Sequence, residues 1–136
     1  MAIERAPVRV VLVVEDDGPV GDLLSGAIND EQGYLALRVS KGPDALRALE
    51  AVKTDVVLLD IGLPGMSGIE VLDHMRDDER LARVPVIFQT GAAPEHAAEL
   101  RERGVATYVS KPFDLNDVVD YVKRLAPPPR EYAADG

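Results

Sequence analysis

Short apolar runs alternate along the chain with longer segments in which apolar residues recur every three or four positions. The short runs predict β-strands, and the longer segments predict amphipathic helices. Strict alternation of the two predicts right-handed crossovers and a parallel sheet covered on both faces. The predicted fold is therefore a doubly wound α/β fold with a five-stranded parallel sheet and five helices. We expect strands at 9–14, 34–39, 56–59, 84–88 and 107–109, and helices at 19–29, 43–52, 69–75, 94–103 and 115–125.

The hydrophobic pattern also indicates which strands lie inside the sheet. The runs at 9–14, 56–59 and 84–88 are nearly continuous aliphatic sequence, which is typical of parallel strands buried on both faces. The run at 34–39 instead alternates its larger apolar residues with Ala36 and Arg38. We therefore expect this second strand at an edge of the sheet.

Length and composition fit one globular domain, which we place at residues 8–125. The 136 residues are 46% hydrophobic, which is enough to bury a core without a metal or a disulfide. The absence of cysteine excludes disulfides and thiol chemistry. Three consecutive prolines in the segment 126–136, APPPREYAADG, predict an extended, mobile tail.

Charge narrows the range of partners. The net charge of −9 argues against direct binding to nucleic acid or to an anionic membrane surface. The N-terminus does not resemble a signal peptide, and the longest apolar run is far too short to cross a bilayer. We expect a cytoplasmic protein whose partners are other proteins or cations.

Polar residues follow several of the predicted strands at the point where each strand ends. Glu15 and Asp16 follow the first strand, Asp60 the third, Thr90 the fourth and Lys111 the fifth. The carboxyl ends of parallel strands meet at one edge of the sheet, where ligands bind in open α/β folds. We therefore expect these five side chains to converge.

The types of these side chains indicate phosphoryl chemistry. Carboxylates held close together repel and require a cation at neutral pH. A set of oxygen ligands without histidine or cysteine suits a hard ion such as Mg²⁺. The Thr90 hydroxyl and the Lys111 ammonium match phosphoryl oxygens, and Asp60 is placed to act as a nucleophile that forms an aspartyl-phosphate.

Each of these residues also has an ordinary structural interpretation when it is taken alone. Asp17 suits the N-cap of the first helix, and Asp60 suits a turn after a strand. Thr90 alone is more often structural, and Lys111 alone is more often a solvated surface residue. The joint placement at four strand ends favours the functional interpretation. The glycines of GLPGMSG do not indicate a P-loop, because no Gly-Lys-Ser/Thr follows them.

Four motifs resemble the receiver domain of two-component response regulators. They are VLVVEDD, VVLLDIGLPGMSGIEVL, PVIFQTG and GVATYVSKPF, and the resemblance covers about residues 8–125. It implies the flavodoxin-like strand order 2-1-3-4-5. It also implies that Asp60 is the phosphoacceptor and that Mg²⁺ is held by Asp16 directly, by Glu15 through water, by Asp60 and by the backbone carbonyl of Gly62.

The resemblance assigns further roles around the phosphoryl group. Thr90 and Lys111 resemble the pair that binds the phosphoryl oxygens, and Tyr108 falls at the switch aromatic, whose ring turns inward when Thr90 moves. A cis bond between Lys111 and Pro112 is frequent in the family. Gly62 and Ala92 fall at positions that tune the lifetime of the phosphoryl group by shielding or orienting water. Both are small here, so they neither orient the attacking water nor shield the phosphate from it. The sequence leaves open which of these two effects on the lifetime is the larger.

The resemblance implies a stand-alone response regulator. It would accept a phosphoryl group from a sensor histidine kinase or a phosphotransfer protein, and would then bind a downstream protein or relay the phosphate. It would be no enzyme in the usual sense, although it would assist its own phosphoryl transfer and dephosphorylation. We also expect a homodimer through the fourth helix, the fifth strand and the fifth helix.

Other classes of protein fit less well. A non-phosphorylated pseudo-receiver that serves as an interaction module is the main alternative, and it is disfavoured because every chemical position is filled. A phosphatase that forms an aspartyl-phosphate usually has a second acid two residues after the nucleophile, where this chain has Gly62. A flavin-binding protein of similar fold is disfavoured because the acidic loop after the first strand would repel a cofactor phosphate.

Overall fold

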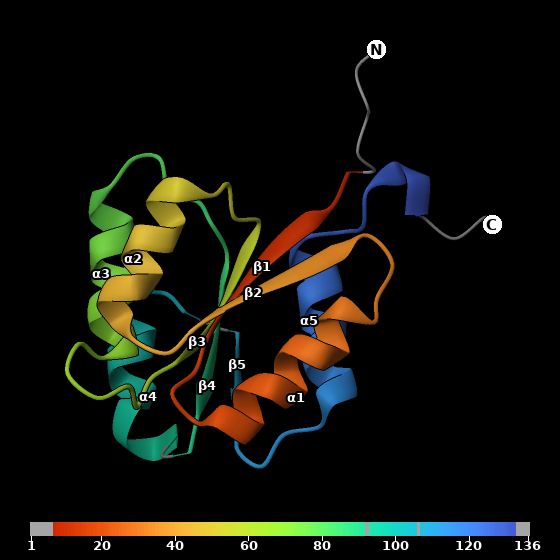
Figure 1. The fold of residues 1–136 in the computed structure, drawn as a ribbon. Coiled ribbons are helices and arrows are strands. Elements are labelled where there is room, and N and C mark those ends of the chain that lie inside the picture. Colours follow the sequence, from red (N-terminus) through yellow and green to blue (C-terminus); the bar gives the residue numbers. More distant parts are fainter. Residues whose placement is uncertain (1–6, 92, 106, 133–136) are drawn as a thin grey trace.

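Five parallel strands form one sheet in the order β2-β1-β3-β4-β5 in the computed structural model, which describes residues 7–91, 93–105 and 107–132. Helices α2, α3 and α4 cover one face of the sheet, and α1 and α5 cover the other (Figure 1). The predicted doubly wound fold and strand order are confirmed. The strands are β1 (Arg9–Val14), β2 (Tyr34–Val39), β3 (Val56–Asp60), β4 (Val86–Thr90) and β5 (Tyr108–Ser110). The helices are α1 (Gly18–Asn29), α2 (Gly42–Ala51), α3 (Gly68–Asp77), α4 (Ala93–Glu102), α5 (Leu115–Leu125) and the short 3₁₀ helix η1 (Arg130–Tyr132).

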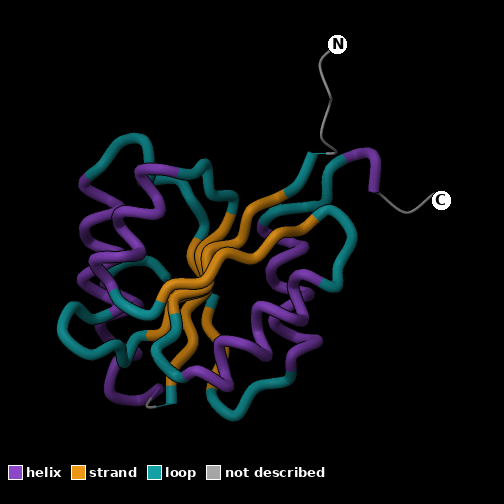
Figure 2. The backbone as a smooth tube through the Cα atoms, in the orientation of Figure 1, coloured by secondary structure: helices purple, strands orange, loops and turns teal. Residues whose placement is uncertain are grey.

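The central strands separate two hydrophobic clusters because successive side chains of a strand point to opposite faces. In β3, Val57 and Leu59 belong to the cluster under α2, α3 and α4, whereas Val56 and Leu58 belong to the cluster under α1 and α5. Every residue of β3 is buried. Figure 2 shows the strands as a layer between the two groups of helices. The continuous aliphatic run is thus explained by burial on both faces.

Strand β2 lies at an edge of the sheet, as its alternating pattern predicts. It pairs with β1, and Leu35 exposes 42% of its surface. Strand β5 forms the opposite edge. None of the helices in the described part of the chain combines the length and the apolar character that crossing a bilayer requires.

Two strands begin and end later than the hydrophobic pattern predicts. Strand β4 spans Val86–Thr90 rather than 84–88, because residue 84 belongs to the preceding turn, where Val84 donates its N–H to the carbonyl of Leu81. Strand β5 spans Tyr108–Ser110 rather than 107–109. In both strands the backbone ladder continues through polar residues at the carboxyl end. The helices occupy their expected segments, α5 with the expected bounds and the others with at least one end shifted by one or two residues.

The segment that follows α5 packs across the amino ends of β1 and β2. The hydroxyl of Tyr34 donates to the carbonyl oxygen of Ala126 at 2.6 Å, and Nε of Arg9 donates to that of Pro127 at 2.8 Å. Tyr132, in η1, lies against Gly33, where an added Cβ would come within 2.8 Å of the ring. The predicted extended tail is therefore wrong for η1, which is helical. The mobility of the tail stays a prediction, and residues 133–136 lie outside the described residues.

Candidate functional site

The predicted site residues meet at the carboxyl edge of the sheet. Glu15 and Asp16 follow β1, Asp60 ends β3, Thr90 ends β4 and Lys111 follows β5. Since β1, β3, β4 and β5 are consecutive neighbours in the sheet, their four carboxyl ends lie next to one another. The sheet order therefore brings together residues that are up to 96 positions apart in sequence.

Three carboxylates form a compact set of oxygen ligands. One carboxylate oxygen from each of Glu15, Asp16 and Asp60 lies within 4.8 Å of the others. Glu15 is completely buried and Asp60 exposes 5% of its surface, whereas Asp16 is exposed. Such closely spaced carboxylates are suited to a hard divalent cation, and a donor set made only of oxygen fits Mg²⁺.

Lys111 is the counter-ion of the two buried carboxylates. Its Nζ donates to Oε1 of Glu15 at 3.0 Å and to Oδ2 of Asp60 at 3.3 Å. Its backbone N–H donates to the carbonyl of Thr90 at 2.9 Å, which fixes the chain after β5 beside the end of β4. The peptide bond from Lys111 to Pro112 is cis, as the resemblance implies. A cation thus already lies between two of the predicted metal-binding carboxylates.

Burial and mutual contacts set the protonation of Glu15 and Lys111. Burial, and after it the neighbouring Asp60, raise the pKa of Glu15 to about 7, because the hydrogen bonds from Lys111 and from the backbone N–H of Asp17 only partly oppose them. Burial alone would lower the pKa of Lys111, but its contacts with Glu15 and Asp60 outweigh that effect and raise it. Lys111 therefore stays charged, and a further cation at the carboxylates would favour ionised Glu15.

The turn after β3 explains the glycines that follow Asp60. The backbone N–H of Gly62 donates to Oδ1 of Asp60 at 3.0 Å, which orients the carboxylate. A Cβ at Gly68 would lie 2.4 Å from the backbone oxygen of Asp60, so only glycine allows α3 to begin this close to β3. Ser67 caps α3 by accepting a hydrogen bond from the N–H of Glu70 at 3.2 Å. Sequence reasoning identified a turn here but missed the close contact at Gly68.

The remaining predicted residues are Thr90, Tyr108, Asp17 and Ala92. Thr90 is buried at the end of β4, and Tyr108, in β5, is 40% exposed. Asp17 caps α1 by accepting from the N–H of Val20 at 3.0 Å, so its capping interpretation is confirmed. Ala92 lies outside the described residues. The roles of Thr90 and Tyr108 in switching, and of the Gly62 carbonyl as a ligand, stay predictions.

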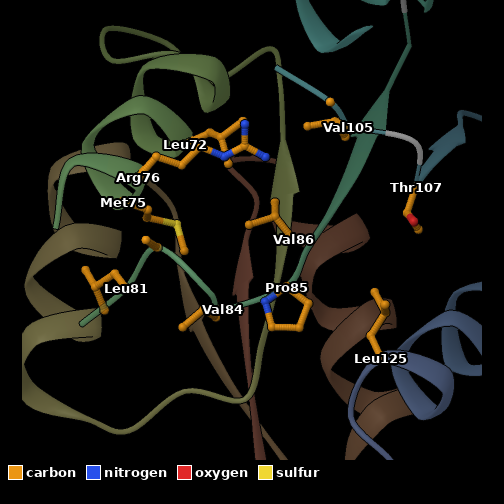
Figure 3. A pocket seen from close by; sticks show the side chains of 12 residues that line it. Leu72, Met75, Arg76, Leu81, Val84, Pro85, Val86, Val105, Thr107 and Leu125 are labelled. Atoms are coloured by element: carbon orange, nitrogen blue, oxygen red, sulfur yellow. The ribbon is translucent and has the colours of Figure 1, made fainter. Parts of the chain in front are cut away.

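A cavity of about 260 Å³ lies at the other end of the sheet (Figure 3). It is lined by residues that precede β4 and β5, including Val84, Pro85 and Val105, and by Leu72 and Met75 of α3. None of the described residues that line it carries a carboxylate. The cavity is therefore separate from the candidate site.

Comparison with known proteins agrees with this geometry. The family of response regulator receiver domains matches residues 11–123. Sporulation initiation phosphotransferase F of Bacillus subtilis is 34% identical over 117 residues, which cover 86% of this chain and 93% of that protein. The polar-differentiation response regulator DivK of Brucella ovis is 34% identical over 116 residues, which cover 85% of this chain and 94% of that protein.

Solved structures share the fold. The chemotaxis protein CheY4 of Vibrio cholerae matches with a TM-score of 0.79 at 24% identity, over 87% of this chain and 98% of that one. The receiver domain of a sensor histidine kinase from Pseudomonas aeruginosa PAO1 matches with a TM-score of 0.75 at 29% identity, over 88% of this chain and 98% of that one. That structure has a magnesium ion coordinated in its active site cleft.

Proposed function

The chain belongs to the family of response regulator receiver domains, and from this premise we propose that it accepts a phosphoryl group onto Asp60 from a sensor histidine kinase or a phosphotransfer protein. Receiver domains are phosphorylated signalling proteins, so the protein is a phosphoacceptor and not an enzyme that turns over a separate substrate. The observation that carries the proposal is the cluster of Glu15, Asp16 and Asp60 within 4.8 Å, with the Lys111 ammonium between two of them.

The donor set of this chain fits Mg²⁺. Asp16 and Asp60 would hold the ion directly, with the backbone carbonyl of Gly62, and Glu15 would act through water. Bound Mg²⁺ offsets the negative charge of the phosphoryl oxygens. The magnesium ion seen in the Pseudomonas aeruginosa receiver domain supports this assignment by analogy.

The transfer is a displacement in which Asp60 is the nucleophile. One carboxylate oxygen of Asp60 forms a bond to phosphorus as the bond from phosphorus to the donor histidine nitrogen breaks. The Gly62 N–H, which binds Oδ1 of Asp60, restricts the carboxylate to an orientation that leaves Oδ2 toward Lys111. The Lys111 ammonium then stabilises charge on the transferring group.

We assign the conformational response to phosphorylation to Thr90 and Tyr108. The Thr90 hydroxyl binds a phosphoryl oxygen, and the ring of Tyr108, a residue that is 40% exposed, moves inward as Thr90 moves toward the phosphate. The surface formed by α4, β5 and α5 changes as a result, and a downstream protein binds it or the phosphate passes on. The protein exchanges between an inactive and an active conformation. Phosphorylation shifts this equilibrium only as far as the phosphoryl group interacts more favourably with the active conformation. A homodimer through this surface, a cytoplasmic location and the absence of nucleic-acid binding stay predictions.

The proposal is tested by intact-mass measurement after incubation with acetyl phosphate and Mg²⁺. We expect a gain of one phosphoryl group, which is lost without the metal and in Asp60→Asn. Asp73→Asn is the matched control, because it also removes a carboxylate but lies on α3 outside the site, and it should retain the gain. Absence of any gain from acetyl phosphate and from a phosphohistidine donor, with folded protein, would contradict the proposal and favour a pseudo-receiver.

A further inference from the structure

Arg38, in the edge strand β2, lies beside the loop that carries Asp16. Its register partner in β1 is Val13, whose side chain belongs to the cluster under α1 and α5, so Arg38 projects toward α1. Sequence reasoning treated it only as a polar position of an edge strand. We infer that Arg38 is a positioning residue that fixes the loop 15–17 and thereby places Asp16 for Mg²⁺ binding; the inference rests on the proposed function.

The guanidinium group of Arg38 joins the two ends of this loop to α1. Nη2 donates to the backbone carbonyl of Glu15 at 3.4 Å and to that of Asp17 at 3.3 Å. Nη1 donates to Oδ1 of Asp22 at 3.2 Å. The two carbonyls that accept from Nη2 flank Asp16 in sequence. Because Asp16 is exposed, its position depends on the backbone of the loop, which the guanidinium restrains.

Gly21 makes room for this arrangement. A Cβ at Gly21 would lie 2.1 Å from Nε and 2.4 Å from Cζ of Arg38, so any side chain there would displace the guanidinium. Gly18 and Gly26 lie on the same helix, and a Cβ at either would meet nothing within 4 Å. Glycine in a helix interior is unfavourable relative to alanine, and at position 21 the glycine is explained by the space that Arg38 occupies.

The positive charge of Arg38 and its hydrogen bonds have opposite effects on Mg²⁺ binding. A guanidinium near the carboxylates repels a divalent cation, so removing the charge would strengthen Mg²⁺ binding while releasing the loop would weaken it. Variants that keep the charge separate the two effects. Gly21→Ala displaces the guanidinium without removing it. Arg38→Lys keeps the charge but loses the planar fork in which Nη1 binds Asp22 while Nη2 binds the two carbonyls.

The test measures Mg²⁺ binding directly by isothermal titration calorimetry on the full chain. We expect Gly21→Ala and Arg38→Lys each to raise the Kd for Mg²⁺ by about 3- to 10-fold, the effect of losing an ordinary hydrogen bond. Gly26→Ala is the matched control and should bind like the wild type. The double variant should bind no more weakly than the weaker single variant, because both changes act on one contact.

Phosphorylation kinetics add a second measurement. The Mg²⁺ concentration for half-maximal reaction with acetyl phosphate should rise in the two variants, while the rate at saturating Mg²⁺ stays close to the wild type. If the wild type does not bind Mg²⁺, the proposed function itself fails at its metal site. If the wild type binds and Arg38→Lys keeps the same Kd, the inference is overturned and the proposed function stands. Because Arg38→Lys decides the outcome alone, the test survives even if Gly21→Ala does not fold.

Discussion

Gln89 is expected to be a site where an apolar substitution stabilises the protein. It is completely buried in β4, in register with Asp60 of β3 and Val109 of β5. Ile87, two residues earlier, belongs to the cluster under α1 and α5, so the Gln89 side chain projects into the same face. Neither its amide nitrogen nor its amide oxygen has a hydrogen-bond partner among the described residues. The folded state therefore holds a buried amide whose polar atoms have no hydrogen-bond partner among the described residues.

The magnitude follows from the cost of an unpaired polar group. Such a group costs about 1–3 kcal/mol when it is buried. Gln89→Met replaces the amide by an apolar group of similar length, and repacking after a volume-conserving change costs less than about 1.5 kcal/mol. We expect the free energy of unfolding to rise by about 1–2 kcal/mol. In a domain of this size the melting temperature would rise by roughly 3–8 °C.

The assay is urea denaturation followed by circular dichroism, with the slope of the transition compared between variants. An unchanged slope shows that the folded and unfolded states expose the same surface as in the wild type. Gln32→Met is the control, because Gln32 is exposed and its substitution should change stability by less than about 0.5 kcal/mol. A loss of about 1 kcal/mol or more in Gln89→Met would mean that the amide is hydrogen-bonded in the folded protein, and would refute the reasoning.

Three further variants test other contacts. Tyr34→Phe should lower the free energy of unfolding by about 1–2 kcal/mol in chemical denaturation, because it leaves the buried carbonyl of Ala126 without its donor; a change within error would contradict this. Gly68→Ala should cost about 1–3 kcal/mol in the same assay, because its Cβ would meet backbone that cannot rotate away, and a neutral result would mean that α3 shifts freely. The hydrogen bond from Arg103 lowers the pKa of Asp73 below its unfolded value of 3.8, so the pair stabilises the fold above that pH and the contribution is lost as pH falls through the folded pKa. Asp73→Asn should therefore cost at most about 0.5 kcal/mol at pH 7, since the side chain is half exposed, and nothing in strong acid; an equal loss at both pH values would exclude the ion pair as its cause.

The sequence predicts the sheet well because burial on both faces leaves a clear mark. The aliphatic run of β3 can be read directly, and so can the alternation that marks β2 as an edge. The carboxyl ends of β4 and β5 are missed because polar residues such as Thr90 and Ser110 still pair in the ladder. Hydrophobicity reports burial against the core and does not report backbone hydrogen bonding, so it marks the end of a strand too early where the site begins.

The candidate site could be predicted because its residues directly follow the strands. The topology then brings Glu15, Asp60 and Lys111 together without any knowledge of side-chain geometry. The contact between Arg38 and Gly21 could not be predicted in this way, because it depends on the path of one long side chain across the start of a helix. The sequence signal for this contact is a glycine within the α1 segment and an arginine within the β2 segment. It can be interpreted only once the strand register shows that the two face each other.

The two ends of the described chain lie side by side at the amino ends of the strands (Figure 1). Strand β1 has six residues, so this end of the molecule lies about 20 Å from the carboxylates, which is the length of the strand. An affinity tag or a fluorescent label attached at either of these described ends would therefore be remote from the carboxylates. A protein held on a solid support through such a tag would present its acidic cluster to the solution, so kinase docking can be measured on the immobilised chain without the support blocking the site.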